Sequence, residues 1–383
     1  MIPAGIYPPL EDSLLLASVV RDHAKGRVLD MGCGSGIQSA TALKNKKVTS
    51  VLGVDVNAAA IKHCKKTVPG ATFIISDLFT KVPRKTFDTI LFNPPYLPRD
   101  DFPDDPATIG GKEGWETIAC FLDAAPDYLS DNGSILLLFT SLTKKDMVHQ
   151  LIDHALLNWT LLATNHIAFE TYYVYELKPN AVRRDAQKHG VTSIHYFTKG
   201  KRGLIHTGVR RKKNVVLKID NPKSAAIGRL DNEARILKLV NKKDIGPRFL
   251  FSTENLVCYE FAKGRPIKEW LPDASKKKAI DVLRDVLRQC FILDQLNLQK
   301  EEMHHPHKHI IVGKKTVLLD FERAHHTSRP HNVTQCCQYI GAIAPILEEK
   351  GMVVEPRKFR ELASLYSRAP SEAHLQLIMN QLH

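Results

Sequence analysis

The stretch RVLDMGCGSG, residues 27–36, joins a short apolar run to an aspartate and three closely spaced glycines, and it decides the fold. The run 27–30 has the length and composition of a buried strand, and a helix is expected after the loop. The alternating glycines Gly32, Gly34 and Gly36 allow a sharp turn and let a ligand lie against the main chain at the start of that helix. A glycine-rich loop is also compatible with a purely structural turn between strand and helix.

Further apolar runs of strand length follow, with helical segments between them: Val51–Asp55, Ala71–Ser76, Thr89–Phe92 and Ser134–Phe139. Short, fully apolar strands that alternate with helices are typical of a parallel sheet covered on both faces, so the predicted fold class is α/β. The stretches 160–168 and 171–177 are richer in Thr and Tyr and lie close together, which predicts a terminal antiparallel pair. In such sheets, ligands bind beyond the carboxyl ends of the strands.

Acidic residues stand at or after the ends of the first three strands. Asp30 precedes the glycines, so the loop runs DxGxGxG, the pattern of S-adenosylmethionine methyltransferases, whereas dinucleotide dehydrogenases have GxGxxG. Asp55 ends the second strand, where an acid binds ribose hydroxyl groups. Asp77, after the third strand, could accept a hydrogen bond from an adenine amine, or it could cap the segment that follows.

The motif Asn93-Pro94-Pro95-Tyr96 follows the fourth strand and is the most specific signal in the chain. The Asn93 side chain offers one acceptor and two donors, and a proline-fixed backbone carbonyl beside it offers a second acceptor. Together they can hold both hydrogens of a planar NH2 group while Tyr96 stacks on the attached π-system. Catalysis of this kind needs positioning and electrostatics rather than a strong general base. The alternative is a Pro-Pro turn that merely ends a strand.

The segment YPPLEDS, residues 7–13, resembles the N-terminal signature of the HemK-type release-factor glutamine methyltransferases, particularly of their short archaeal and eukaryotic members. The segments NPPYLP, residues 93–98, and GGKEGW, residues 110–115, are also similar to segments of that family. The resemblance spans about residues 5–178. It implies a Rossmann-like, seven-stranded sheet that binds S-adenosyl-L-methionine.

The resemblance also implies roles for individual residues. It places Asn93, Pro94 and Tyr96 at the methyl acceptor. It gives the cofactor site Glu11, Asp12, Asp30, Gly32, Gly34, Gly36, Asp55 and Asp77. The implied acceptor is the glutamine of a GGQ loop in a translation release factor, and some short members need a small zinc-binding activator subunit. Because the NPPY motif is shared with enzymes that methylate adenine or cytosine amines, a DNA or RNA acceptor stays open as the alternative.

Charge is distributed unevenly along the chain. Residues 1–180 hold 17 basic and 20 acidic residues, whereas residues 181–383 hold 37 basic and 21 acidic residues. Such asymmetry indicates two units and an anionic partner for the second, such as RNA or the ribosome, although a solvated lysine-rich surface explains it equally well. The polar stretch 179–194 breaks the apolar pattern and predicts a boundary. The expected parts are 1–178, 195–345 and a helical segment, 346–383, that packs on the second domain.

Lys218 and Glu233 form the first functional pattern of the second half. Lys218 ends the apolar strand VVLK, and Glu233 lies early in an amphipathic helical segment. A strand lysine paired with a helix glutamate is how kinases hold the phosphates of ATP. Each residue is also one that an ordinary surface strand or helix can carry.

The segments EEMHHPHKHIIV, residues 301–312, and VLLDFERA, residues 317–324, resemble the catalytic loop and the metal-binding strand of RIO-like kinases. Together they most resemble an archaeal group of predicted serine/threonine kinases, and the resemblance covers about residues 195–342. It implies a small α+β kinase-like domain that binds ATP and magnesium, with Asp320 as the magnesium ligand. The alternative for Asp320 is an ordinary aspartate at a strand end.

This segment departs from the kinase pattern at its catalytic loop. The usual HRD triplet is absent, and the position of its base holds His304. His309 stands where kinases have a metal-binding asparagine, and Glu302 is the nearest carboxylate that could replace the base. A non-catalytic pseudokinase that docks on RNA or the ribosome is therefore the alternative to a phosphate-transferring kinase. Four closely spaced histidines around a proline do not have the spacing of a zinc site.

Composition excludes several classes of protein. With 383 residues, of which 43% are hydrophobic and 25% charged, the chain has the composition of ordinary globular domains rather than of disordered proteins. Its apolar runs are far shorter than the roughly 18 residues of a membrane span. The N-terminus has no export signal, and seven scattered cysteines without a CxxC pair are typical of reduced thiols in the cytoplasm.

Overall fold

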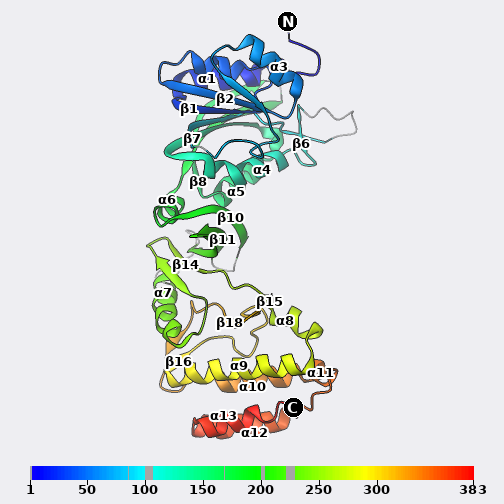
Figure 1. Ribbon diagram of the computed structural model, residues 1–383, viewed down its shortest axis with the longest axis vertical. Helices are drawn as coiled ribbons and strands as arrows, with labels where there is room; N and C mark the ends of the chain where they lie inside the picture. The colour runs from blue at the N-terminus through cyan, green and yellow to red at the C-terminus, as the bar shows by residue number, and fades with distance from the viewer. Residues whose placement is uncertain (1, 85, 100–106, 168, 200–202, 221–228) are drawn as a thin grey trace. The chain divides into compact units, whose positions relative to one another are not determined.

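The computed structural model describes residues 2–84, 86–99, 107–167, 169–199, 203–220 and 229–383 (Figure 1). The chain divides into two compact units. One comprises residues 1–197 and 208–211, and the other comprises residues 198–207 and 212–383. The division therefore falls after the polar stretch in which the sequence suggested a boundary.

The first unit is built on a seven-stranded sheet with the strand order β3-β2-β1-β4-β7-β9-β8. Its strands are β1 (Gly26–Met31), β2 (Val48–Asp55), β3 (Thr72–Ile75), β4 (Phe87–Phe92), β7 (Leu129–Thr140), β8 (Leu157–Ile167) and β9 (Glu170–Pro179). The first five strands of the order pair in parallel, and β9 runs antiparallel to both β7 and β8. The predicted α/β sheet with its terminal antiparallel pair is thus confirmed, although residue 168 lies outside the described residues.

Helices cover both faces of this sheet because its central strands are apolar on both sides. One core joins Val28 and Leu136 to α1 (Glu11–His23) and α2 (Ile37–Leu43). The other core joins Leu29 and Ile90 to α4 (Glu116–Ala124) and α5 (Lys145–His154). A further helix, α3 (Ala58–Thr67), connects β2 to β3. The chain order reverses between the neighbours β1 and β4, so a ligand is expected to bind at the loops that follow these two strands.

The polar stretch 179–194 folds with the first unit through α6 (Ala181–Lys188). The side chain of Asn180 caps this helix by accepting a hydrogen bond from the backbone N of Arg183 at 2.9 Å. Arg183 is fully buried and donates to the carbonyl of Ala155 at 3.0 Å and to the carboxylate of Asp127 at 2.7 Å. The first unit extends past residue 178 because these polar side chains anchor a packed helix.

The second unit is α+β. The largest sheet to which it contributes has the order β10-β11-β12-β14-β13, and residues 191–197 of β10 and 208–210 of β11 are assigned to the first unit. The strands are β10 (Val191–Lys199), β11 (Gly203–Arg210), β12 (Lys213–Asp220), β13 (Phe249–Ser252) and β14 (Leu256–Glu260), and α7 (Arg229–Val240) lies between β12 and β13 in sequence. The smaller strands are β15 (Arg265–Pro266), β16 (Leu298–Gln299), β17 (Ile310–Val312), β18 (Thr316–Leu318) and β19 (His325–His326). The remaining helices are α8 (Ile267–Trp270), α9 (Lys276–Gln295), α10 (Asn332–Ala342), α11 (Ala344–Glu348), α12 (Pro356–Arg368) and α13 (Glu372–Met379).

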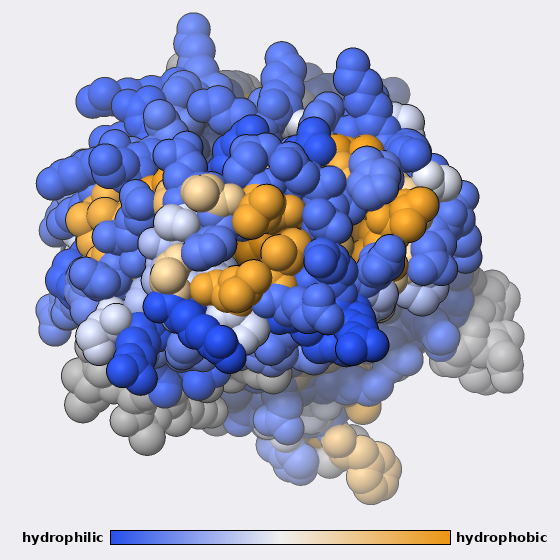
Figure 2. Space-filling model, turned by 90° about the horizontal axis from the view of Figure 1, so that it is seen from below, coloured by the Kyte–Doolittle hydropathy of each residue, from blue (hydrophilic) through white to orange (hydrophobic). Residues whose placement is uncertain are grey.

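The last two helices pack on the second unit. On α12, Phe359 and Tyr366 are buried, and the Tyr366 hydroxyl donates to the carboxylate of Asp294 on α9 at 3.0 Å. Seen from the end that carries α12 and α13, the surface is mainly hydrophilic with small apolar patches (Figure 2). Leu365 and Leu377 on these helices are about half exposed. Within the described residues, every helix is too short or too polar to span a bilayer.

Candidate functional sites

The loop after β1 holds the three predicted glycines in the left-handed backbone region. The φ angles are 63° at Gly32, 50° at Gly34 and 81° at Gly36, values that other residues disfavour. Gly36 precedes α2, and a Cβ there would lie 2.9 Å from the Sγ of Cys64. A Cβ on Gly34 would approach no atom closer than 3.9 Å. The loop is therefore packed at Gly36 and open at Gly34.

Two acidic residues hold this loop from different sides. Asp55, at the end of β2, accepts hydrogen bonds from the backbone N of Gly34 and of Asn57, both at 2.8 Å. Because a carboxylate has about four acceptor positions, the half-buried Asp55 retains some for a ligand. Asp30 is 2% exposed and accepts a hydrogen bond from the Oγ of Ser39 at 2.6 Å, and burial raises its pKa to about 7. Asp30 thus supports the loop from inside the protein.

Asp77 lies exposed in the turn that follows β3. Its backbone carbonyl accepts hydrogen bonds from the backbone N of Thr80 at 3.0 Å and from the Oγ1 of Thr80 at 2.8 Å. No helix begins in the described residues 78–84, so the alternative that Asp77 caps a helix is wrong. Its carboxylate is accessible to a ligand.

Asn93 directly follows β4, as predicted. Its Nδ2 donates to Oδ2 of Asp12 at 2.9 Å and lies 3.5 Å from the Oγ of Ser13. Its Oδ1 is buried, and no described group donates a hydrogen bond to it. A Cβ on Gly32 would lie 3.6 Å from the ring of Phe92, the residue before Asn93. The loops after β1 and β4 are therefore neighbours.

The segment GGKEGW fixes the backbone of the NPPY motif. The short strands β5 (Leu97–Pro98) and β6 (Ile109–Gly111) pair in parallel just after the motif. A Cβ on Gly110 would lie 2.5 Å from the carbonyl oxygen of Pro95, and one on Gly114 would lie 2.5 Å from that of Tyr96. Only glycine permits so close an approach of two backbones, which explains why this segment has glycine at both positions.

Tyr96 differs from its predicted orientation. Its side chain is buried, its hydroxyl donates to Oδ2 of Asp12 at 3.4 Å, and its ring meets the edge of Tyr172 with centroids 6.4 Å apart. Most of the ring therefore packs inside the protein, which limits the stacking on a substrate that the sequence suggested. Pro94 is also buried. Glu170 accepts a hydrogen bond from the Tyr172 hydroxyl at 2.9 Å. The sequence assigned no role to either residue, and its only signal for them was the Tyr-rich composition of this strand.

The first turn of α1 contributes one buried and one exposed acid. Glu11 is exposed, whereas Asp12 is 2% exposed and faces Asn93 and Tyr96. Burial and the Asp12 carboxylate raise the pKa of Tyr7 to about 12, which places this tyrosine beside the same group. The Nε2 of Gln38 on α2 donates to the backbone carbonyl of Ser13 at 2.8 Å and so ties the helix after the glycine loop to α1.

A second cluster surrounds Lys218 on β12. Its Nζ lies 2.8 Å from Glu233 on α7, 3.1 Å from Asp320 and 3.0 Å from Glu322. Burial alone would lower the pKa of Lys218, but the three carboxylates raise it well above its ordinary value. Burial would raise the pKa of Asp320, but Lys218 lowers it. The sequence paired Lys218 with Glu233 and placed Asp320 nearby, but it assigned no role to Glu322.

The other predicted residues of the second half lie beside Asp320. His309 has Nδ1 3.7 Å from Asp320 and Nε2 3.6 Å from Glu302, and burial lowers its pKa. Glu302, half exposed, also accepts a hydrogen bond from Arg323 at 3.1 Å. The sequence missed Lys300, which is 2% exposed with its Nζ 5.4 Å from the centre of the Phe321 ring. Among the described residues, Glu233, Asp320 and Glu322 have oxygens close enough together to hold a metal ion.

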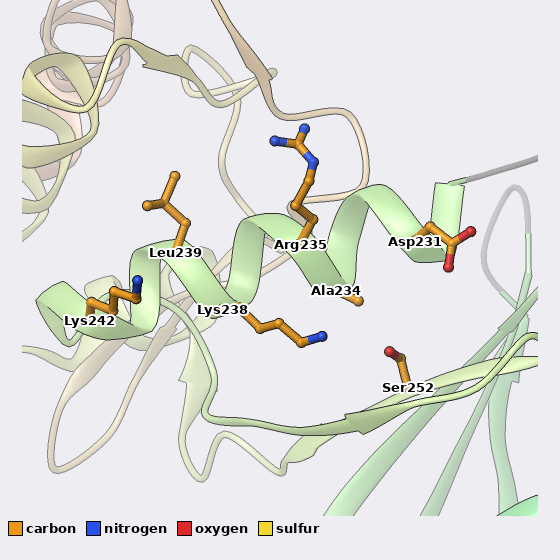
Figure 3. A pocket seen from close by; sticks show the side chains of 7 residues that line it. All are labelled: Asp231, Ala234, Arg235, Lys238, Leu239, Lys242 and Ser252. Atoms are coloured by element: carbon orange, nitrogen blue, oxygen red, sulfur yellow. The ribbon is translucent and has the colours of Figure 1, made fainter.

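Two surface hollows of the second unit lie away from these residues. The first, of about 340 Å³, lies between α7 and β13 (Figure 3). Its lining is Asp231, Ala234, Arg235, Lys238, Leu239, Lys242 and Ser252. The second, of about 560 Å³, lies along α10 and α12 and includes Arg360 and Arg368. Neither is lined by Lys218, Glu233, Glu302, His309 or Asp320.

Comparison with known proteins gives a match over the first unit. Residues 11–175 match the family described as the methyltransferase small domain. A Methanocaldococcus jannaschii protein assigned as a protein N5-glutamine methyltransferase is 38% identical over 156 residues, covering 38% of this chain and 78% of that protein. A release factor glutamine methyltransferase of Rhodopirellula baltica is 30% identical over 154 residues, covering 34% of this chain and 51% of that protein. This chain thus spans about half the length of the R. baltica protein.

One solved structure comes from the E. cuniculi Mtq2–Trm112 complex, which methylates the eRF1 translation termination factor. It is 26% identical, covers 46% of this chain and 99% of that chain, and has a TM-score of 0.39. The family match, together with the large share of the M. jannaschii relative that this chain covers, settles the classification of the first unit. Through residues 11–175 the chain belongs to the methyltransferase small-domain family, with HemK-type release factor glutamine methyltransferases as homologues over its N-terminal half.

Proposed function

We propose that the first unit methylates the amide nitrogen of a glutamine in a GGQ-type loop of a translation release factor. The observation that carries the proposal is the Oδ1 of Asn93, a buried acceptor to which no described group donates, at the carboxyl end of β4. Burying an acceptor without a partner costs about 1–3 kcal/mol, so a ligand that donates a hydrogen bond there gains affinity. A planar NH2 group is such a ligand.

The residues of the glycine loop fit S-adenosyl-L-methionine. The loop is open at Gly34, and the Asp55 carboxylate has acceptor positions left for ribose hydroxyl groups. When bound, the cofactor supplies a methyl group on a positively charged sulfur, which keeps the bonding electrons when an attacking nitrogen takes the methyl and releases one proton. Asn93 and the carbonyl of Pro94 would hold the two amide hydrogens and orient the nitrogen. In this scheme the chain supplies positioning and needs no strong base.

The choice of a glutamine amide is supported by the N-terminal signature and by the names of the two relatives. An adenine or cytosine amine in DNA or RNA is the alternative, because its NH2 group makes the same hydrogen bonds. Under the glutamine proposal the protein acts beside translation, in the cytoplasm. A small zinc-binding activator subunit also belongs to the proposal, on the HemK-type resemblance.

Transfer of the labelled methyl group from radiolabelled S-adenosylmethionine tests this function. The acceptors, assayed in parallel, are a GGQ release factor, its variant with the GGQ glutamine replaced by alanine (GGA), and bulk nucleic acid. We expect label on the GGQ protein, none on the GGA variant, and none from the Asn93→Ala enzyme, which should still bind the cofactor. Label on nucleic acid alone would refute the glutamine assignment. The assay is run with and without a co-purified zinc-binding subunit, so that a missing activator is distinguished from a wrong acceptor.

We also propose that the second unit binds ATP with magnesium. The pair between Lys218 and Glu233, 2.8 Å long and nearly solvent-free, is the observation that favours this function. The lysine would meet the nucleotide phosphates, while Asp320 would hold magnesium, with His309 and Glu302 beside it. Two outcomes are open: phosphate transfer to serine or threonine, or nucleotide binding alone in a pseudokinase that docks on RNA or the ribosome through the basic half of the chain.

Thermal unfolding with ATP and magnesium tests the binding proposal, with magnesium alone as the control. A rise in Tm that Lys218→Met abolishes is expected, and an unchanged Tm would refute nucleotide binding. Transfer of labelled phosphate from ATP then separates a kinase from a pseudokinase.

A further inference from the structure

The carboxylate of Asp12 is surrounded by hydrogen-bond donors. It is 2% exposed, and its Oδ1 accepts from the backbone N of Ser13 at 2.6 Å. Its Oδ2 accepts from the Nδ2 of Asn93 at 2.9 Å and from the Tyr96 hydroxyl at 3.4 Å. These three partners fill most of the acceptor positions of this buried carboxylate within the protein. Two of these partners, Asn93 and Tyr96, belong to the acceptor motif, whereas the sequence resemblance had assigned Asp12 to the cofactor.

We propose that Asp12 is a positioning residue that fixes the orientation of the Asn93 amide, so that its Oδ1 faces the NH2 group of the methyl acceptor. The inference rests on the proposed methyl transfer. It does not depend on whether the acceptor is a glutamine amide or a base amine, because both present two N–H donors.

The argument begins from the shape of the asparagine side chain. An amide has nearly the same shape in its two flipped orientations, so packing alone selects neither. An ionised carboxylate can only accept hydrogen bonds. In the flipped orientation the Oδ1 of Asn93 would face an oxygen of Asp12, and the Nδ2 would face the donor hydrogens of the substrate. Asp12 therefore excludes the orientation in which Asn93 repels its substrate.

The charge of Asp12 also makes the Oδ1 of the Asn93 amide a stronger acceptor. Hydrogen bonds in a chain polarise one another, so an amide that donates to a carboxylate becomes a better acceptor at its oxygen. The acceptor nitrogen gains positive charge as it forms a bond to the methyl carbon, and a preorganised negative dipole stabilises that change. The effect of Asp12 should thus be larger on kcat than on KM.

An exchange of the two side chains provides the sharpest test. Asp12→Asn keeps the shape but can donate as well as accept, so it no longer selects one orientation; kcat should fall about ten- to hundredfold, as for a lost hydrogen bond to a charge. Asn93→Asp places two carboxylates together and should lower kcat at least as far. In the double variant, the amide introduced at position 12 can donate to one oxygen of the carboxylate introduced at position 93. The other oxygen of that carboxylate is then left for the substrate, so the kcat of the double variant should exceed that of both single variants.

The controls separate positioning from folding and from cofactor binding. Asp22→Asn, an exposed change on the same helix, should leave kcat unchanged. Calorimetry should give an S-adenosylmethionine Kd that Asp12→Asn leaves unaltered. A weaker Kd with an unchanged kcat would return Asp12 to the cofactor site and overturn the proposal. A double variant no faster than the slower single variant would also overturn it.

A measurement on the unaltered protein covers the case in which the variants do not fold. With selectively 15N-labelled asparagine, one Nδ2 proton of Asn93 should be protected from exchange with solvent in the protein without substrate. Rapid exchange of both protons would refute the bond to Asp12. If the wild-type enzyme labels nucleic acid and leaves the release factor unlabelled, the glutamine assignment fails, whereas the exchange of the side chains at positions 12 and 93 can still be measured on that acceptor.

Discussion

Replacing Gly36 by alanine tests how firmly the glycine loop is fixed. A left-handed φ of 81° costs a residue with a side chain about 1–2 kcal/mol. The added Cβ would also lie 2.9 Å from the Sγ of Cys64 and 3.0 Å from a methyl group of Val68. Overpacking of this kind costs about 1–3 kcal/mol, and the stiffer unfolded chain returns about 0.4–1 kcal/mol. We expect Gly36→Ala to lower the free energy of unfolding of the first unit by about 2–4 kcal/mol.

Gly190→Ala is the matched control, because it separates backbone strain from overpacking. Gly190 has a φ of 77°, close to that of Gly36, but a Cβ there would meet no atom within 4 Å. Its substitution should therefore cost only about 1 kcal/mol. Urea unfolding measures the loss of stability in both variants. The transition of the first unit is identified as the one that S-adenosylmethionine shifts to a higher urea concentration. Calorimetry should show weaker cofactor binding for Gly36→Ala alone.

Equal losses of stability in the two variants would refute the overpacking argument. A destabilised Gly36→Ala protein with unaltered cofactor affinity would instead refute the assignment of this loop to the cofactor. Because each result contradicts a different step, the comparison tests the packing and the proposed function separately.

Three further predictions concern single acids. Asp55→Ala should weaken binding of S-adenosylmethionine by about 1.5–3 kcal/mol for each hydrogen bond lost to the carboxylate, and an unchanged Kd in calorimetry would contradict its ribose role. The pKa of Asp30 is raised from 3.8 to about 7 by burial, so its ionisation destabilises the folded unit increasingly between about pH 4 and pH 7. Asp30→Asn should therefore raise Tm at pH 8 but hardly at pH 4. Equal changes in Tm at the two pH values would contradict the raised pKa of Asp30. Asp320→Ala should abolish the magnesium-dependent Tm shift with ATP, and its persistence would exclude Asp320 as the metal ligand.

The sheet of the first unit could be predicted because its strands are short, apolar and regularly spaced. The run 27–30 and its neighbours needed no tertiary information, since burial on both faces is visible in composition. The boundary at 179–194 could not be placed from composition. Its polar residues include Arg183, whose guanidinium is buried against Asp127. A sequence window contains the arginine but not the aspartate that compensates its charge.

The candidate site likewise has one part that the sequence predicts and another that it does not. Asn93 was predictable because a strand-end asparagine followed by two prolines has a specific chemistry. The direction of Asp12 was not, because its partner lies 81 residues away and only the fold brings them together. The burial of Tyr96 was not predictable for the same reason, because its hydroxyl bonds to the distant Asp12.

The two candidate sites use carboxylates in opposite ways. Asp12 accepts one amide hydrogen of Asn93, which leaves the neutral Oδ1 of Asn93 as the acceptor that the proposed NH2 group would use. Around Lys218, three carboxylates meet the Lys218 ammonium and the Arg229 guanidinium, which lies 3.6 Å from Glu322, so the carboxylates outnumber these two cations by one. For the nucleotide binding proposed above, a cation that offsets the excess carboxylate would ease the approach of the phosphates to this lysine. Under the proposed nucleotide binding, magnesium held by Glu233, Asp320 and Glu322 would offset this excess of carboxylates beside the phosphates.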